Sequence, residues 1–197
     1  MNKSLQQELM TLCAQDEETR AELVASGELF DGYHPRMAAV HTRNANALSR
    51  IVDEWGWPGV SLVGNKGAEA AWLVLQHSIG HPELQRRCLP LLQGAADAGD
   101  IPAVYVAYLE DRICCFEERP QRYGTQFDWD DNGQMSPLPI QDPDRVDSLR
   151  DSVGLGPLLE RIEQVRKDAR AEGQQPPADR EKRQREKRAW ARSVGWI

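Results

Sequence analysis

Apolar residues recur at helical spacing along most of the chain, and this pattern predicts a mostly helical fold. Near the N-terminus, Leu5, Leu9 and Leu12 follow one another at intervals of four and three residues, so they lie on one face of a helix. This helix is expected to continue through Leu23. It is expected to stop near Gly27, because glycine readily adopts the left-handed conformation that ends many helices.

The same periodicity predicts further helices. A linker at residues 31–35 leads to a second helix, which Gly56-Trp57-Pro58-Gly59 should end. The segment 68–79 follows a loop at residues 64–67 and is apolar nearly all round, which is typical of a buried central helix that Gly80 should end. The helices expected after the first cover about residues 36–55, 68–79, 83–98, a stretch that begins after Pro102, 142–153 and 157–172.

One segment departs from the helical pattern and predicts a hairpin. Phe127 and Trp129 alternate with polar residues, and Asp131-Asn132-Gly133 is a sequence typical of a hairpin turn. Pro137 and Pro139 lack the backbone N–H of a central strand, so the return strand should be an edge strand. The expected fold is therefore mostly α, a single helical domain of about six to seven helices with a small β-hairpin near 126–140.

We place the domain at residues 1–172 and a linker with a basic charged tail at 173–197. Gly173-Gln174-Gln175-Pro176-Pro177 has the composition of a linker, and the residues after it are strongly charged. Two interpretations of the tail are open, a solvated helix and a disordered segment. Trp190 and Trp196 indicate that its end docks on an apolar surface, and the chain itself is one candidate.

Composition is that of a soluble globular protein, with 40% hydrophobic and 28% charged residues among 197. No apolar run approaches the roughly 18–20 residues of a membrane helix, and the N-terminus lacks the apolar region of a secretory signal. None of the four cysteines belongs to a CxxC pair, so we expect reduced thiols, a cytoplasmic location and no membrane partner.

The net charge of −7 is distributed unevenly. Residues 178–197 contain seven Lys and Arg against three Asp and Glu, so the preceding residues carry a net charge of −11. An acidic body argues against a nucleic-acid-binding core, because contacts to phosphates need a basic surface. Nucleic acid is therefore expected to bind weakly at most, through the 178–197 tail.

Gln76 and His77 stand near the end of the predicted buried helix. His77 could be a general acid–base, a metal ligand or a hydrogen-bond donor to a ligand. The alternative is a structural histidine that is hydrogen-bonded in the core. On a later helix, Asp111 could orient His77, and the planar fork of Arg112 could clamp a carboxylate or a phosphate. The alternative for that pair is an internal ion pair that joins helices.

A third polar group follows on a loop, at Tyr123-Gly124-Thr125-Gln126. Neutral hydrogen-bonding side chains on a loop suit the orientation of a small polar molecule, and the glycine allows close approach of a backbone. The alternative is a turn whose side chains bond to one another. Of the three polar groups, this loop is the one in which we expect ligand contact most.

A metal is not expected at these residues. His77 and His81 have the spacing of two ligands on one helix face, but Gly80 and Pro82 should break the helix between them. The glutamate of an HExxH site is also absent. If a metal does bind, the best set is His41, His77 and His81.

Four short motifs follow one another along the chain: Trp55-Gly56-Trp57-Pro58, the segment 71–77, Leu109-Glu110-Asp111-Arg112 and the segment 121–126. They resemble the motifs of a bacterial family of unknown function, the DUF6624 family. The resemblance covers roughly residues 40–160, and several short matches keep their order. His41 also resembles a motif position of that family. The resemblance implies which residues matter, but the family has no established activity to transfer.

Two functional classes remain open. The first is an enzyme, a hydrolase or group transferase, that acts on a small polar or anionic metabolite. In it His77 is the acid–base, Asp111 and His41 support it, and Arg112 clamps the anion. The second is a non-catalytic ligand-sensing or immunity-type module with a protein partner. The sequence does not indicate whether a cofactor is used or which one it is. The ligand-contacting residues are expected to be His41, Gln76, Tyr123, Thr125 and Gln126.

Overall fold

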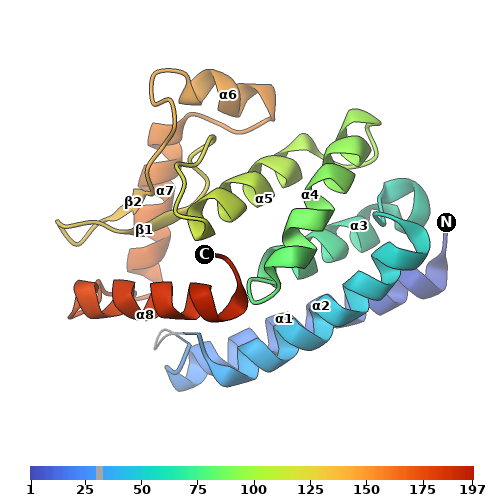
Figure 1. Cartoon of the computed structure of the whole chain (residues 1–197), viewed down its shortest axis with the longest axis horizontal. Helices are drawn as coiled ribbons and strands as arrows, with labels where there is room; N and C mark the ends of the chain where they lie inside the picture. The colour runs from blue at the N-terminus through green and yellow to red at the C-terminus, as the bar shows by residue number, and fades with distance from the viewer. Residues whose placement is uncertain (30–32) are drawn as a thin grey trace. The chain divides into compact units, whose positions relative to one another are not determined.

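The computed structural model describes residues 1–29 and 33–197. These residues form eight helices and one two-stranded antiparallel sheet (Figure 1), which confirms the mostly α prediction. They divide into two compact units, residues 1–105 and residues 106–197. The domain boundary expected near residue 173 stays a prediction.

Four complete helices build the first unit. They are α1 (Lys3–Ser26), α2 (Pro35–Trp55), α3 (Val60–His77) and α4 (Pro82–Asp97), and α5 (Ala103–Phe116) begins at the end of this unit. The first three pack against one another. Their core is aliphatic, because the apolar stripe of each helix turns inward. Its fully buried leucines are Leu9, Leu23, Leu48, Leu75 and Leu92.

Local sequence signals account for the ends of α1 and α2. The Asn2 side chain accepts a hydrogen bond from the backbone N–H of Leu5 at 3.1 Å, and Gly27 ends α1 in the left-handed conformation. Pro35 occupies the first turn of α2, where its missing N–H costs nothing, and Gly56 follows its last residue. Of the linker predicted at 31–35, residues 31 and 32 lie outside the described residues.

The loop predicted at residues 64–67 is wrong. Helix α3 already begins at Val60, and Gly64, with a φ of 71°, makes only a kink within it. The predicted end near Gly80 is also wrong, because α3 ends at His77 and the backbone N–H of Ser78 donates to the Leu75 carbonyl at 3.1 Å. His77 is therefore the last residue of a buried helix, and its side chain is partly exposed.

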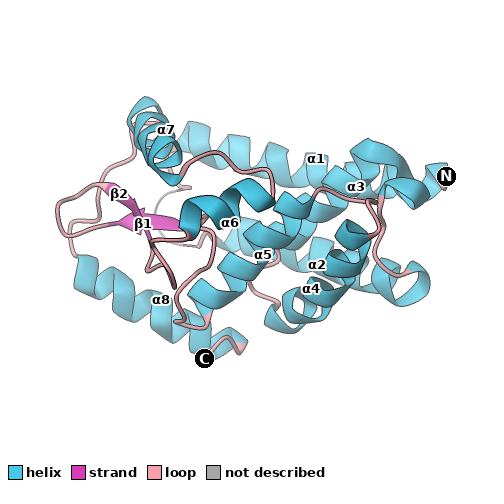
Figure 2. Ribbon diagram, turned by 90° about the horizontal axis from the view of Figure 1, so that it is seen from above, coloured by secondary structure: helices cyan, strands magenta, loops and turns pink. Residues whose placement is uncertain are grey.

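The second unit contains the rest of α5, the hairpin and three further helices. The strands β1 (Phe127–Trp129) and β2 (Met135–Pro137) pair as predicted, with Trp129 opposite Met135 (Figure 2). Arg166 holds the return strand, since its Nε donates to the Met135 carbonyl at 2.9 Å. The helices are α6 (Val146–Ser152), α7 (Leu158–Ala171) and α8 (Arg180–Val194).

The charged tail forms helix α8, so the helical interpretation of the tail is the right one. The Asp179 side chain caps its start by accepting from the backbone N–H of Lys182 at 2.8 Å. Trp196, only 3% exposed, stacks on Phe116 with ring centroids 5.0 Å apart. The tail thus docks on the chain itself, and it adds one helix to the number expected.

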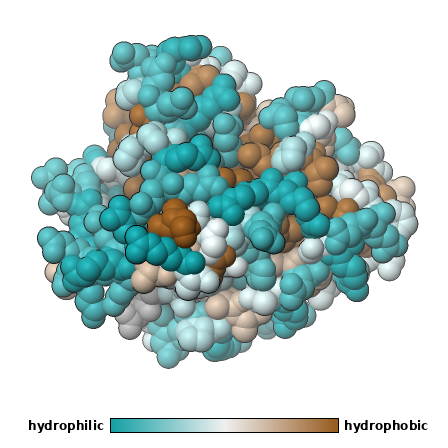
Figure 3. Space-filling model, viewed as in Figure 1, coloured by the Kyte–Doolittle hydropathy of each residue, from teal (hydrophilic) through white to brown (hydrophobic). Residues whose placement is uncertain are grey.

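Two further expectations concern cysteines and membranes. All four cysteines are free thiols. Burial raises the pKa of Cys115 to about 12, which makes a nucleophilic thiolate unfavourable there. No helix among the described residues is long and apolar enough to cross a bilayer. The face seen in Figure 3 is mostly hydrophilic.

Candidate functional site

Three polar side chains from three helices meet inside the first unit. Asp16 comes from α1, His41 from α2 and His77 from the end of α3. The Nδ1 atom of His77 lies 2.7 Å from Oδ2 of Asp16, and Nε2 of His41 lies 3.4 Å from Oδ1 of the same carboxylate. Asp16 therefore bridges the two histidines, and we call these three residues the Asp16 cluster.

The packing of the helices explains why the cluster forms. Asp16 continues the apolar face of Leu9, Leu12 and Leu23, so the same face that buries those leucines buries its carboxylate. Asp16 is 1% exposed. His41 occupies the equivalent place on the buried face of α2. An ionised carboxylate in such a place needs hydrogen-bonding partners, which the two histidines supply.

Tyr33 extends the cluster on the side of His41. Its hydroxyl lies 2.8 Å from Nδ1 of His41. Burial, with a smaller effect from the negative charge of Asp16, raises the pKa of Tyr33 to about 12, so the phenol keeps its proton at neutral pH. A phenol that donates to Nδ1 leaves the His41 proton on Nε2, which faces Asp16. The chain of donors then runs from Tyr33 through His41 to Asp16.

The charge of Asp16 is maintained by its two partners. Burial alone would raise the pKa of Asp16, but hydrogen bonds and electrostatic attraction from His41 and His77 outweigh that effect. The pKa of Asp16 consequently lies well below its usual value. The cluster thus holds a buried, ionised carboxylate that can accept from both rings.

His77 is the member of the cluster that solvent reaches. Its side chain is 31% exposed, whereas that of Asp16 is 2% exposed. Asp16 occupies its Nδ1 atom, and no hydrogen-bond partner of its Nε2 atom is found within residues 1–29 and 33–197. A ring nitrogen held in this way can take a proton from a bound molecule or return one.

The Asp16 cluster also has the composition of a metal site. One nitrogen from each histidine and one oxygen of Asp16 lie within 4.8 Å of one another. Two histidines and a carboxylate with an open position are a common donor set for Zn²⁺ and Fe²⁺. The structure brings His41 and His77 together with Asp16. The predicted alternative had His81 as its third ligand.

Gln76, a predicted ligand contact, precedes His77 on α3. It is 3% exposed, and neither its Oε1 nor its Nε2 atom has a hydrogen-bond partner in the described part of the chain. An unpaired buried amide costs about 1–3 kcal/mol. Its role in binding stays a prediction.

Asp111 anchors a loop of the second unit. Its buried carboxylate accepts from the backbone N–H groups of Arg122 at 2.7 Å, Tyr123 at 3.0 Å and Thr125 at 2.9 Å. It also accepts from the Thr125 hydroxyl at 3.0 Å. These contacts fix the loop to α5. The carboxylate that lies on His77 is that of Asp16, and the catalytic role predicted for Asp111 stays a prediction.

The loop 121–126 is bonded to its own surroundings. Gly124 has a φ of 67°, and a Cβ there would lie 2.9 Å from the Leu158 side chain. Arg150 donates to the Tyr123 carbonyl at 2.8 Å. Tyr123 and Thr125 are 7% and 8% exposed, so their contacts are those of the internally bonded turn. Ligand contact by Tyr123, Thr125 and Gln126 stays a prediction.

Arg112 lacks the ion pair that the structural alternative requires. No hydrogen bond or ion pair of its side chain is found among the described residues, and its buried Nε atom has no partner there. Arg112 lines a cavity of the second unit together with Gln126.

The predicted site residues form two groups. His41, Gln76 and His77 belong to the first unit, whereas Asp111, Arg112, Tyr123, Thr125 and Gln126 belong to the second.

Sequence reasoning missed Asp16 and Tyr33. The signal for Asp16 was present, because it is an acidic residue at a position of the helix repeat where a leucine would be expected. The motifs of the resemblance cover roughly 40–160, so they do not point to the first helix. Tyr33 carried no signal of its own, because it lies just before α2 and sequence spacing does not show that its hydroxyl contacts His41.

The comparison with known proteins includes a family match that extends over the first helix. No curated protein and no solved structure matches the chain. The model of a family of unknown function, DUF6624, matches residues 3–172. This range is wider than the one expected from the motifs, and it includes all three residues of the Asp16 cluster as well as Asp111 and Arg112. The chain belongs to the DUF6624 family.

Proposed function

We propose that this protein is an enzyme, a hydrolase or group transferase that acts on a small polar or anionic metabolite with His77 as its acid–base. One observation carries the proposal. The buried carboxylate of Asp16 holds Nδ1 of a partly exposed His77 at 2.7 Å, while Nε2 has no partner among the described residues.

The geometry supports proton transfer for a physical reason. A carboxylate on Nδ1 fixes the tautomer with its proton on that atom, so Nε2 is the basic nitrogen. The same carboxylate stabilises the imidazolium that forms when Nε2 accepts a proton. A buried ionic network adds less to stability than apolar packing of the same volume. A purely structural role would therefore not explain why polar residues occupy the buried positions of the Asp16 cluster.

The proposed step begins with removal of a proton. Nε2 of His77 takes the proton of a hydroxyl or water, whose oxygen forms a bond to the electrophilic carbon or phosphorus of the substrate. The bond to the leaving group breaks with its electron pair, and the imidazolium returns the proton to that group. Water as the nucleophile gives hydrolysis, and an alcohol as the nucleophile gives group transfer.

Incubation of the full chain with an extract of small metabolites, followed by mass spectrometry, tests this proposal. We expect at least one polar compound to be consumed by the wild type but not by His77→Gln. His34→Asn is the matched control, because His34 caps α2 and asparagine can cap a helix equally well. Consumption by His77→Gln at the wild-type rate, or by neither protein in extracts from several sources, would contradict the proposal.

A metal centre on the same residues is a second candidate. The separation of 3.4 Å between Nε2 of His41 and Oδ1 of Asp16 is long for a hydrogen bond. It is close to the roughly 3.4 Å between two ligands of a tetrahedral zinc ion. In a metal centre, Nε2 of His41 would carry no proton and Nδ1 would donate its proton to the Tyr33 hydroxyl, as metal-binding histidines do with their outer partners.

Metal analysis separates the two candidates. Equilibrium dialysis against Zn²⁺ should give one bound ion per chain for the wild type and none for Asp16→Ala if the cluster is a metal centre. In that case a chelator abolishes consumption of the substrate. If His77 acts as an acid–base without a metal, the chelator leaves consumption unchanged.

A further inference from the structure

Arg112 presents an unpaired positive charge inside the second unit. Its side chain has no ion pair or hydrogen bond among residues 1–29 and 33–197, and its Nε atom is buried. Burial lowers the pKa of Arg112 to about 10, so the guanidinium still carries its charge at neutral pH. A charge that is removed from water without a partner is unfavourable. A buried guanidinium of this kind is therefore expected where a bound ligand supplies the negative charge.

A cavity of about 260 Å³ lies against Arg112. Its walls come from α5, the hairpin and α8, all of them parts of the second unit. The charged residues in the wall are Arg112, Arg183, Lys187 and Asp128, which together carry a net charge of +2. The cavity is thus electropositive within a protein whose net charge is −7.

Asp128 is already occupied by the two cations of α8. Its Oδ1 atom lies 2.6 Å from Nη1 of Arg183, and its Oδ2 atom lies 3.3 Å from Nζ of Lys187. Burial alone would raise the pKa of Asp128, but the charges of Lys187 and Arg183 lower it. Asp128 therefore fixes the two cations at the wall, and Arg112 has no carboxylate of its own.

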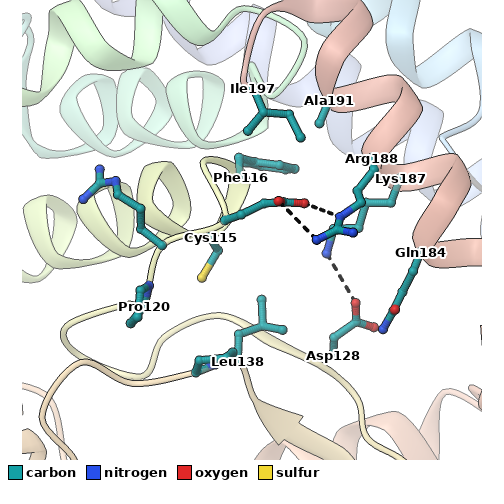
Figure 4. Close-up of a pocket in the computed structure, with 13 residues that line it drawn as sticks. Cys115, Phe116, Pro120, Asp128, Leu138, Gln184, Lys187, Arg188, Ala191 and Ile197 are labelled. Carbon is teal, nitrogen blue, oxygen red and sulfur yellow. Dashed lines mark hydrogen bonds and ion pairs between the residues drawn. The ribbon is translucent and has the colours of Figure 1, made fainter. Parts of the chain in front are cut away.

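The remaining wall suits the organic part of a ligand. Gln126 adds an amide whose Nε2 donates to the Thr125 hydroxyl, and Phe127 and Trp129 add aromatic surface. A second cavity of about 460 Å³ shares Cys115, Leu138 and Lys187 with the first. Figure 4 shows Phe116, Leu138 and Ile197 around this second cavity, with Asp128 bonded to Lys187 at one side. A ligand whose charged group lies in the first cavity could thus place an apolar group in the second.

We propose that this cavity binds the phosphate group of a small phosphorylated compound, with Arg112 as the main ligand of the anion. The planar fork of a guanidinium matches two oxygens of a phosphate group, and an arginine without a competing carboxylate is free to make that contact. A phosphate monoester carries about two negative charges at neutral pH, which matches the net charge of the wall. A carboxylate would neutralise only one of the two.

The proposal stands apart from the role of His77, because its residues all belong to the second unit. Arg112 and Gln126 lie within the family match at residues 3–172, whereas Arg183 and Lys187 lie beyond it. The anion site therefore combines motif residues of the family with the C-terminal helix of this chain.

Isothermal titration calorimetry of the full chain tests the proposal, at constant ionic strength in chloride. The probes are inorganic phosphate, phenyl phosphate and acetate. We expect phosphate to bind, phenyl phosphate to bind more tightly because its ring enters the apolar part, and acetate to bind at least tenfold more weakly than phosphate. Arg112→Met should weaken phosphate binding at least tenfold, and Lys187→Met should weaken it less. Arg185→Met is the matched control, because Arg185 lies on α8 but lines neither cavity.

Thermal melting without phosphate gives the second readout. Arg112→Met removes an unpaired charge and keeps an unbranched apolar side chain, so its melting temperature should equal or exceed that of the wild type. A lower melting temperature for Arg112→Met would show a structural arginine and overturn the proposal. Unchanged phosphate binding in Arg112→Met, tighter binding of acetate than of phosphate, or no binding of either phosphate probe to the wild type would overturn it as well. If Arg112→Met does not fold, Lys187→Met decides, and unchanged phosphate binding in that variant overturns the proposal.

Discussion

The Nδ1 atom of His77 lies 2.7 Å from Oδ2 of Asp16, although 61 positions separate the two residues in the chain. The contact joins the end of α3 to the buried face of α1. Asp16 is an acidic residue among the buried leucines of α1, and this contact makes it the partner of a partly exposed histidine. The proposed chemistry depends on this pair more than on any other contact of the first unit.

Asp16→Asn should remove the function of His77 with a smaller effect on folding. The amide keeps the shape of the carboxylate but not its charge, so it no longer fixes the tautomer or stabilises an imidazolium. Where a carboxylate holds a catalytic histidine in this way, the same change lowers kcat by about 10⁴. The rate of substrate consumption measures the effect. Asp53→Asn, which changes an exposed carboxylate paired with Arg87, should leave the rate unchanged.

Asp16 should also make stability depend on pH. Its pKa in the folded protein is depressed, so its contribution to the free energy of unfolding is present above the unfolded value of about 4. That contribution is lost as the pH falls from about 4 towards the depressed folded value. Urea unfolding between pH 6 and 3 should therefore show a steeper loss for the wild type than for Asp16→Asn, by at most about 1.4 kcal/mol per pH unit. Parallel curves would refute the assignment.

Asp111→Asn should destabilise the loop that the carboxylate anchors. An amide nitrogen would face the N–H and hydroxyl donors of Thr125, which need an acceptor. We expect a loss of about 2–4 kcal/mol in the free energy of unfolding, measured by denaturant titration. Asp151→Asn, an exposed change on α6, is the control and should have little effect. Equal stability of the two variants would show that the anchor is unimportant.

Gly124→Ala should combine strain with a steric clash. The left-handed backbone alone costs about 1–2 kcal/mol for a residue with a Cβ. That Cβ would also lie 2.9 Å from the Leu158 side chain and 3.2 Å from that of Ile140. Gly154→Ala is matched, since Gly154 has a φ of 78° but no atom within 4 Å of the position that a Cβ would take. The melting temperature should fall further for Gly124→Ala than for Gly154→Ala. An equal fall in the two variants would show that backbone strain acts without a steric clash.

Gln76→Met should leave the protein as stable as the wild type or make it more stable. The carboxamide is buried without hydrogen bonds among the described residues, so its replacement by an apolar chain of similar length removes a cost of about 1–3 kcal/mol. If Gln76 also contacts the ligand, as predicted, substrate consumption should fall in the same variant. Marked destabilisation in thermal melting would show that the amide has a structural partner.

Most of the helices were predictable because they follow a local pattern. The spacing of Leu5, Leu9 and Leu12 specifies α1, and the alternation around the Asp131–Gly133 turn specifies the hairpin. The start of α3 was not predictable, because Gly64 and Gly67 are typical of a loop. Packing against α1 decides there, since the Gln6 side chain lies 3.1 Å from the position of a Cβ on Gly64 and 3.4 Å from that on Gly67. Propensity is a weak signal when tertiary contacts oppose it.

The candidate site was predictable only in part. His77 stood out as a polar residue near the end of an apolar helix, His41 as a motif position of the family resemblance, and Asp111 and Arg112 as charges on one helix. Sequence spacing could not show that Asp16 lies between the two histidines, because that contact depends on how three helices pack. His77 and His81 do not share a helix, as Gly80 and Pro82 predicted, since α3 ends at His77 and α4 begins at Pro82.

The tautomer of His77 tests the central claim most directly. The claim is that Asp16 holds the proton on Nδ1 and leaves Nε2 as the free base. Nitrogen NMR of the neutral imidazole, assigned by comparison with His77→Gln, should show a protonated Nδ1 and an unprotonated Nε2. In Asp16→Asn this preference should be lost. A neutral ring in the wild type with its proton on Nε2 would contradict the account.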